Sequence, residues 1–374
     1  MIHFQSLTRA ELAALLLPLG RKKLRRDLSP EEAELKLAKQ ARYRAQQVFH
    51  WVYQRQVLDW GQMTDLSKDL RSWLQENVEI YQPIELQSQQ ATDGTMKFLW
   101  DLQDHKTVES VIIPAALQEK EPEAAGEASE PAKQRLTLCI SSQVGCAMKC
   151  KFCLTGIQGL ERHLQVHEIV GQVLELRRRA PITNIVFMGM GEPLHNFENV
   201  VKACEILLDQ DGLNFSKRKV TVSTSGLVPA IEELGKRIDV SLAVSLNATT
   251  DEQRSEIMPV NKKWNIKALL DACRKYPLGS HRRITFEYVL LKDFNDSLED
   301  AARLVRLVQG IPSKINLIPF NEHPGSTLKR PADDTVLNFQ RYLLDRDVTA
   351  LIRISRGQDI LAACGQLRSV FKTG

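Results

Sequence analysis

The sequence predicts an α/β fold, an incomplete (β/α)6 barrel preceded by a small helical N-terminal accessory domain. From residue 135 onward, strand-like and helix-like segments alternate about six times, which is typical of parallel strands joined by crossover helices. Residues 1 to about 90 instead show helical periodicity with little alternation. Because about eight units close a full barrel, we expect a laterally open barrel, although an open doubly wound sheet would give nearly the same pattern.

The bulk composition is that of an ordinary globular protein. The 374 residues are 43% hydrophobic, enough for two or three domains, and the net charge of +4 does not by itself indicate a polyanionic partner. The apolar run 13–19 is too short to span a bilayer, so we expect no signal peptide and no membrane segment. Seven cysteines, three of them within eight residues, favour a reducing cytoplasm and metal or redox chemistry.

Residues 1–92 are predicted to form a helical RNA-binding accessory domain. This segment carries a basic run at 21–26, and Arg42 and Arg44 are interleaved with aromatic residues. The mix suits contacts with phosphates and bases, but a solvated helix face over a small aromatic core fits the pattern equally well. The aromatic residues are Tyr43, Phe49, Trp51 and Tyr53.

The remaining chain divides into three predicted parts. Residues 93–117 read as a β-hairpin linker with strands at 96–102 and 107–114. Residues 118–134 lack aromatic and β-branched side chains, so we expect a disordered acidic loop without a catalytic role. Residues 135–374 are predicted to form the barrel together with a C-terminal segment that contains Cys364, to which a catalytic role is given below. The expected barrel strands lie near 135–141, 182–189, 219–225, 240–246, 283–291 and 314–320, and the expected helices near 166–179, 199–208, 229–237, 266–276 and 298–308.

Three cysteines directly follow the first expected barrel strand, with the spacing C-x3-C-x2-C: Cys146, Cys150 and Cys153. Three thiolates on one loop can hold three irons of a 4Fe–4S cluster and leave the fourth iron open. In this chemistry, the open iron chelates S-adenosylmethionine and passes an electron into its sulfonium. Structural zinc is the alternative, with His163 or His167 as a fourth ligand, and it would make the chain a non-catalytic RNA-binding module.

Five segments, the first of which contains the three clustered cysteines, carry a specific resemblance. The sequence resembles the radical S-adenosylmethionine methyltransferases that act on an adenine of 23S ribosomal RNA and of certain transfer RNAs, the RlmN/Cfr type. The resemblance runs from the N-terminal helical region to the C-terminus and implies a radical-SAM barrel and methylation of adenine carbon 2. A sister enzyme that methylates carbon 8 and confers antibiotic resistance is the alternative. The segments are 143–155, 189–193, 223–226, 316–321 and 363–366.

The resemblance also implies the residues that bind S-adenosylmethionine. Gly191 and Glu192 would hold its amino group, and polar residues near strand ends would contact its ribose, carboxylate and adenine. Asn247 departs from the family, which usually has histidine there, so it is expected to be a weak contact only. The remaining implied ligands are Ser223, Ser245, Leu246 and Asn321.

Two more cysteines receive roles from the resemblance. Cys364 would accept a methyl group from one S-adenosylmethionine, and a second molecule would activate that group for attack on adenine. Cys139 would then release the product by forming a disulfide with Cys364, while Glu109 removes the proton from the substituted carbon. Cys204 and Cys273 are expected in the core.

The same resemblance implies the partners of the protein. They are 23S rRNA and tRNA, with an external electron donor such as flavodoxin or ferredoxin. A radical activase acting on a protein is a further alternative, but it would not need Cys139 or Cys364. We expect a cytoplasmic monomer that contacts no membrane.

Overall fold

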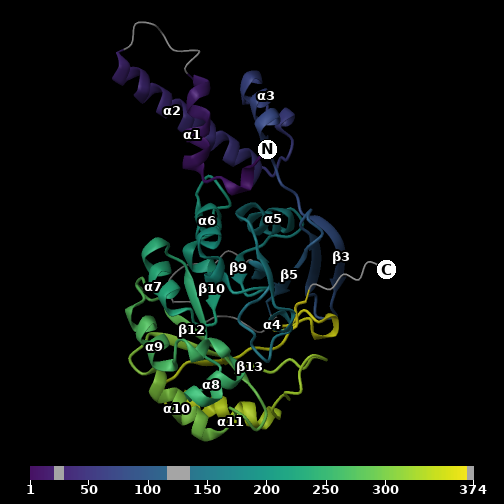
Figure 1. Cartoon of the computed structure of the whole chain (residues 1–374), viewed down its shortest axis with the longest axis vertical. Helices are drawn as coiled ribbons and strands as arrows, with labels where there is room; N and C mark the ends of the chain where they lie inside the picture. The colour runs from purple at the N-terminus through teal and green to yellow at the C-terminus, as the bar shows by residue number, and fades with distance from the viewer. Residues whose placement is uncertain (21–28, 116–134, 369–374) are drawn as a thin grey trace, which may run out of the picture. The chain divides into compact units, whose positions relative to one another are not determined.

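The computed structural model describes residues 1–20, 29–115 and 135–368 and divides into two compact units (Figure 1). Unit 1 comprises Met1–Pro83, Gln165–Pro181 and Glu198–Lys217, and unit 2 comprises the rest. The basic run at 21–26 and the loop expected at 118–134 lie outside the described residues. No helix within the described ranges is long and apolar enough to cross a membrane.

Unit 1 is helical because its sequence places strong caps before amphipathic segments. Ser29 accepts a hydrogen bond from the Glu32 N–H, the Glu32 side chain returns one to the Ser29 N–H, and Pro30 starts the helix, so α2 begins sharply. Ser67 caps α3 in a similar way. The helices of unit 1 are α1 (Arg9–Gly20), α2 (Pro30–Phe49), α3 (Lys68–Asn77), α5 (Val166–Arg177) and most of α6 (Phe197–Leu208).

An aromatic cluster forms the core of unit 1. Phe4 packs against Phe49, Tyr53 and Trp60 at ring-centroid distances of 5.3–5.8 Å, and all four are buried. Trp51 is buried as well, whereas Tyr43 is 61% exposed. Of the aromatic residues considered for base stacking, only Tyr43 is therefore available, and the core interpretation is correct for the other three.

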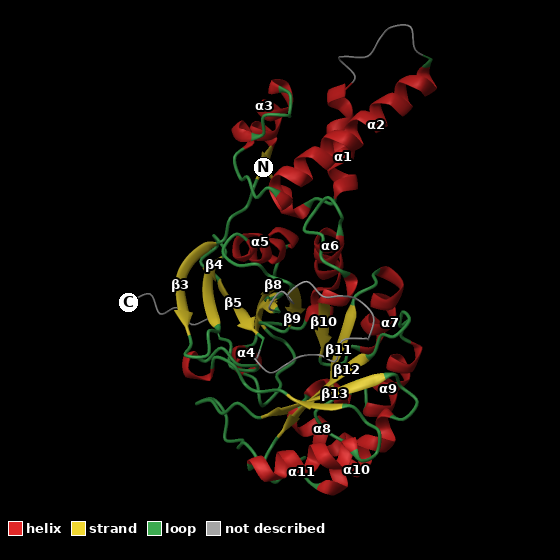
Figure 2. Ribbon diagram, turned by 180° about the vertical axis from the view of Figure 1, so that it is seen from behind, coloured by secondary structure: helices red, strands yellow, loops and turns green. Residues whose placement is uncertain are grey.

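Unit 2 is built on one ten-stranded sheet of order β14-β13-β12-β11-β10-β9-β6-β5-β4-β3 (Figure 2). From β6 to β14 neighbouring strands are parallel, and from β6 back to β3 they are antiparallel. The strands are β3 (Ile84–Gln90), β4 (Met96–Asp101), β5 (Thr107–Pro114), β6 (Leu136–Cys139), β9 (Asn184–Phe187), β10 (Val220–Thr224), β11 (Ser241–Ser245), β12 (Ile284–Leu290), β13 (Ser313–Pro319) and β14 (Ala350–Ile352).

Helices alternate with the parallel strands along the chain, and Figure 2 shows α7, α9, α10 and α11 along one side of these strands. A separate hairpin of β7 (Gln143–Gly145) and β8 (Leu160–His163) frames the cysteine loop. The helices of unit 2 are α4 (Leu154–Gln158), α7 (Val228–Arg237), α8 (Asp251–Ile257), α9 (Ile266–Lys275), α10 (Leu298–Val308) and α11 (Asp333–Leu344).

The predicted open barrel is confirmed, as are its six strands and the hairpin of β4 and β5. The structure adds strand β14, a seventh in the parallel run, and edge strand β3. Both escaped prediction for a physical reason: β14 has three residues, and the mostly polar β3 lacks the alternation of a half-buried strand.

Candidate active site

The strand registers place six polar residues on one face of the sheet. Residues paired across neighbouring strands point the same way, as do residues two apart along a strand. The registers from β5 to β13 therefore place side chains that are far apart in the sequence on the same face of the sheet. The opposite face carries fully buried apolar residues such as Val222, Val244, Phe286 and Ile315. The aligned residues are Glu109, Cys139, Ser223, Ser245, Glu287 and Asn316.

The three clustered cysteines lie on the loop that the β7–β8 hairpin closes. The Cys146 N–H donates to the Gly159 carbonyl at 2.9 Å, and the Cys153 N–H donates to the Cys150 carbonyl at 3.2 Å. Burial raises the pKa of Cys146 to about 12. Burial also raises the pKa of Cys150, and the neighbouring thiols of Cys153 and Cys146 raise it further, so the three sulfurs lie within electrostatic reach of one another.

This donor set fits a 4Fe–4S cluster. Three thiols on one short loop, one buried and two half-buried, match the ligands that such clusters take, and each thiolate binds a separate iron. In the described part of the chain, no three or more His, Cys, Asp or Glu side chains converge on a single metal-ion position, and a cluster with one iron for each thiolate does not require such convergence. None of the seven cysteines forms a disulfide.

The C-terminal segment is fastened to the cysteine loop. The Leu154 N–H donates to the Gly365 carbonyl at 2.8 Å, and the Thr155 hydroxyl donates to the Leu367 carbonyl at 2.7 Å. Gly365 has φ +83°, and a Cβ there would lie 3.0 Å from the Phe152 carbonyl oxygen, so this close approach requires glycine. Cys364 is therefore held directly beside the loop that carries Cys153.

The two predicted catalytic thiols meet at this place. Burial raises the pKa of Cys139, and the Cys364 thiol raises it further. Cys364 is exposed, but its sulfur is partly desolvated, and this desolvation raises the pKa of its thiol, as does the Glu287 carboxylate. The structure thus brings Cys139 from β6 together with Cys364, which lies 225 positions later by their numbers (364 − 139).

Glu109 is buried next to the same segment. Its carboxylate accepts hydrogen bonds from the Lys97 ammonium at 3.1 Å and from the Arg368 N–H at 2.8 Å. Burial raises the pKa of Glu109, while Lys97 and the Arg368 N–H lower it. A carboxylate held in this way is a suitable proton acceptor near the thiols.

The loop after β9 carries Gly191 and Glu192. Gly191 has φ +101°, and a Cβ there would lie 2.5 Å from the Gln143 Cβ, so only glycine fits. Glu192 is 3% exposed, and its carboxylate accepts N–H groups of Ser225 at 2.7 Å and Leu194 at 3.1 Å. Its carboxylate therefore ties this loop to the end of β10.

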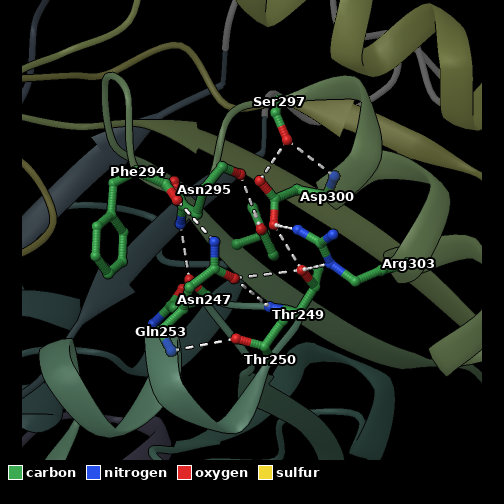
Figure 3. A network of polar contacts seen from close by, with 10 residues as sticks. Asn247, Thr249, Thr250, Gln253, Phe294, Asn295, Ser297, Asp300 and Arg303 are labelled. Atoms are coloured by element: carbon green, nitrogen blue, oxygen red, sulfur yellow. Dashed lines mark hydrogen bonds and ion pairs between the residues drawn. The ribbon is translucent and has the colours of Figure 1, made fainter.

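Asn247 lies in a network of polar contacts after β11 (Figure 3). Its Oδ1 accepts the Val289 N–H at 2.8 Å, and its carbonyl accepts the Asn295 amide at 2.7 Å. The amide of Asn321 donates to the Cys364 carbonyl at 3.1 Å, while its oxygen accepts the Gln358 amide at 3.1 Å. The side chains of Asn247 and Asn321 are thus both engaged within the protein.

Sequence reasoning missed two groups at this site. Glu287 is 7% exposed on β12 and accepts the Asn316 amide at 2.9 Å, beside Ser245 in the same row of the sheet. Burial raises the pKa of Glu287. The sequence signal for this residue was a charged glutamate within the otherwise largely apolar strand sequence 284–290, because a buried charged residue is unusual. The second missed group is Arg254, which is fully buried on α8.

Two family models match the chain: the Radical SAM superfamily over residues 140–305, and the ribosomal RNA large subunit methyltransferase N-terminal domain over 35–80. A dual-specificity RNA methyltransferase RlmN of Geobacter sulfurreducens is 54% identical over 87% of this chain and 86% of its own length. That of Geotalea uraniireducens is 52% identical over 90% and 94%. A crystal structure of a radical SAM methyltransferase from Sphaerobacter thermophilus matches with TM-score 0.82 and 39% identity, covering 98% of this chain and 99% of that one.

The open parallel sheet and the three thiols after its first parallel strand define a radical S-adenosylmethionine enzyme. Its cofactors are a 4Fe–4S cluster and S-adenosylmethionine. Within this superfamily, the chain belongs to the RlmN family of dual-specificity RNA methyltransferases.

Replacing Cys150 with serine removes one thiolate from the candidate ligand set. We expect the anaerobically reconstituted Cys150→Ser protein to lose most of its iron and inorganic sulfide. Cys204→Ala, which changes a buried thiol on α6, is the matched control and should retain wild-type iron. Elemental analysis measures both variants, and wild-type iron and sulfide in Cys150→Ser would remove Cys150 from the ligand set.

Proposed function

We propose that this protein methylates carbon 2 of an adenine in 23S rRNA and in tRNA, through a methyl group carried on Cys364 and a transient disulfide with Cys139. The observation that carries this proposal is that the C-terminal segment with Cys364 is hydrogen-bonded both to the cysteine loop and to the Glu109 carboxylate, with the Cys364 thiol within electrostatic reach of Cys139. A methyltransferase that transferred its methyl group directly would need neither thiol.

Cys146, Cys150 and Cys153 would hold the 4Fe–4S cluster, which when bound supplies the electron that cleaves S-adenosylmethionine reductively. The Cys364 thiolate takes its methyl group by attacking the methyl carbon of a first S-adenosylmethionine, and S-adenosylhomocysteine leaves. A second S-adenosylmethionine, cleaved with one electron, would serve to remove a hydrogen atom from this S-methyl group, whose carbon then bonds to adenine carbon 2. The resulting adduct radical gives up one electron, which balances the electron spent in the cleavage. Each methyl transferred thus uses two molecules.

Product release is the work of Glu109 and Cys139. Glu109 accepts the proton from carbon 2. The Cys139 thiolate attacks the Cys364 sulfur, the S–S bond forms, and the carbon–sulfur bond breaks with its electron pair passing to carbon, which takes a proton to become the methyl group. An external reductant must then reduce the disulfide.

Unit 1 supplies the RNA contacts in this proposal. Lys36, Lys39, Arg42 and Tyr43 are exposed on α2. Lys39 and Tyr43 follow Lys36 by three and seven positions, and Arg42 follows Lys39 by three, which puts the four residues on one face of the helix; we call this face the basic stripe. A hollow of about 440 Å³ lies beside Tyr43 and is lined by further polar side chains, including Arg44. Cations and an exposed ring suit phosphates and an unstacked base.

An external one-electron donor such as flavodoxin or ferredoxin would drive the reaction, and the protein would work as a cytoplasmic monomer. The RNA substrate and the seven free thiols support a reducing cytoplasm.

The two catalytic cysteines should fail in different ways. Cys364→Ala removes the methyl carrier, so we expect no methylated RNA while the iron content stays at wild-type level. Cys139→Ala keeps the carrier but loses the resolving thiol, so protein covalently joined to RNA should accumulate. Denaturing electrophoresis with labelled RNA detects the adduct, with Cys204→Ala as the control. Normal turnover by Cys139→Ala without an adduct would make Cys139 structural.

Lys97→Met should move the pH dependence of methylation. Glu109 must be deprotonated to act as base, and loss of the Lys97 charge removes an interaction that lowers the pKa of Glu109, so this pKa rises further. Activity that falls on acidification should then fall at a correspondingly higher pH in Lys97→Met. Lys106→Met, which removes an exposed ion pair to Glu161 in the same sheet region, is the control. Coincident pH–rate profiles for Lys97→Met and wild type would rule out this role of Glu109.

Tyr43→Ala should weaken RNA binding without disturbing the chemistry. Loss of one stacked base costs about 1–3 kcal/mol, roughly a fivefold to hundredfold rise in Kd for an RNA fragment. Tyr43→Phe keeps the ring and should bind nearly as wild type, and both variants should retain iron. Fluorescence anisotropy measures the affinities, and equal affinity of Tyr43→Ala and wild type would contradict the stacking contact.

A further inference from the structure

Arg254 on α8 is a fully buried cation with an unusual set of partners. Its guanidinium donates to the carbonyl oxygens of Ser225 at 2.6 Å, Ser245 at 2.9 Å and Leu246 at 2.9 Å. It also donates to the Asn261 side-chain oxygen at 3.1 Å. All four acceptors are neutral, so the positive charge is hydrogen-bonded without being neutralised.

These acceptors belong to the strand ends that carry the candidate S-adenosylmethionine ligands. Ser225 follows β10, two residues after Ser223, and its N–H donates to the Glu192 carboxylate at 2.7 Å. Ser245 ends β11, and Leu246 directly follows it. Because the guanidinium is a rigid planar fork, one side chain fixes the spacing between these two strand ends.

The helix that carries Arg254 also holds the cysteine loop. Three residues after Arg254, the Ile257 carbonyl accepts the Lys151 N–H at 3.0 Å, directly beside Cys150. The helix that carries the buried Arg254 is therefore hydrogen-bonded to the residue that directly follows Cys150.

Within the described residues, no carboxylate forms an ion pair with Arg254 at 4.0 Å or less. Asp251 is the carboxylate that raises the pKa of Arg254 electrostatically, but its Oδ1 already accepts hydrogen bonds from the Asn261 amide and the Ile266 N–H. Desolvation lowers the pKa of Arg254 to about 10, which still leaves it charged at neutral pH. A buried cation without a partner is costly, and thiolates binding a cluster would supply the missing negative charge.

We propose that Arg254 is a positioning residue for both cofactors: it fixes the ends of β10 and β11 for S-adenosylmethionine, and its charge balances the thiolate-bound cluster at Cys150. This inference rests on the cluster site described above and adds a residue that touches neither reacting atom. Its two parts separate chemically, because lysine keeps the charge but lacks the planar fork, and glutamine lacks the charge.

The test compares reconstituted wild type, Arg254→Lys, Arg254→Gln and the control Arg177→Gln. Arg177 also donates to a buried backbone carbonyl, that of Leu213, but lies in unit 1. Anaerobic calorimetry gives the Kd for S-adenosylmethionine, EPR-monitored titration gives the reduction potential, and circular dichroism checks folding. Neither the Kd nor the reduction potential requires turnover to be measured, so both are independent of activity.

Arg254→Lys is expected to bind S-adenosylmethionine at least tenfold more weakly. Its reduction potential is expected to stay close to that of wild type, with the equilibrium constant for one-electron reduction changed less than threefold. Arg254→Gln is expected to show the same loss of affinity and a potential more negative by about 59 mV or more, a tenfold shift, because the reduced cluster loses a stabilising cation. Arg177→Gln should match wild type in both.

Wild-type affinity in folded Arg254→Lys would overturn the positioning role, and a wild-type potential in Arg254→Gln would overturn the charge role. If Arg254→Gln does not fold, Arg254→Lys decides alone. The proposal is then contradicted if Arg254→Lys changes both the affinity for S-adenosylmethionine and the reduction potential, or changes neither. Failure of wild type to hold any cluster would instead refute the cluster site itself, so the two failures are distinguishable.

Discussion

The hydrogen bonds between the cysteine loop and the C-terminal segment are the constraint on which the site depends. Leu154 and Thr155 follow the last cysteine of the loop and bond the backbone of Gly365 and Leu367. A side chain at position 365 would collide with the loop, so the approach is close and specific. This pairing brings Cys364, which lies close to the end of the sequence, next to the cysteine loop that follows β6, the first parallel strand.

The sheet registers supply the second constraint. They align polar groups from β5 to β13 on one face and leave the other face apolar and buried. The two faces explain why largely apolar strands carry polar or thiol side chains at the positions of the candidate site. Such buried groups weaken a core unless they are hydrogen-bonded, and Glu287 with Asn316 meets that requirement.

Local patterns in the sequence were sufficient for the barrel and for the cysteine loop, because alternation and ligand spacing are short-range signals. They could not decide whether the aromatic residues of unit 1 face solvent, since Tyr43 and Phe49 lie on the same helix but have opposite burial. They also missed Arg254, because its importance comes from carbonyl groups of two strands that precede it by about 10 to 30 residues. The hydrophobic periodicity of a sequence does not predict a residue whose role comes only from tertiary packing.

The central claim is that the paired thiols serve methylation of carbon 2 of adenine. Its most direct test is nucleoside mass spectrometry of ribosomal and transfer RNA lacking this modification, after anaerobic incubation with the iron-loaded protein, S-adenosylmethionine and a reductant. The account predicts 2-methyladenosine in both RNAs. Appearance of 8-methyladenosine, or of no new nucleoside with a fully loaded cluster, would contradict it.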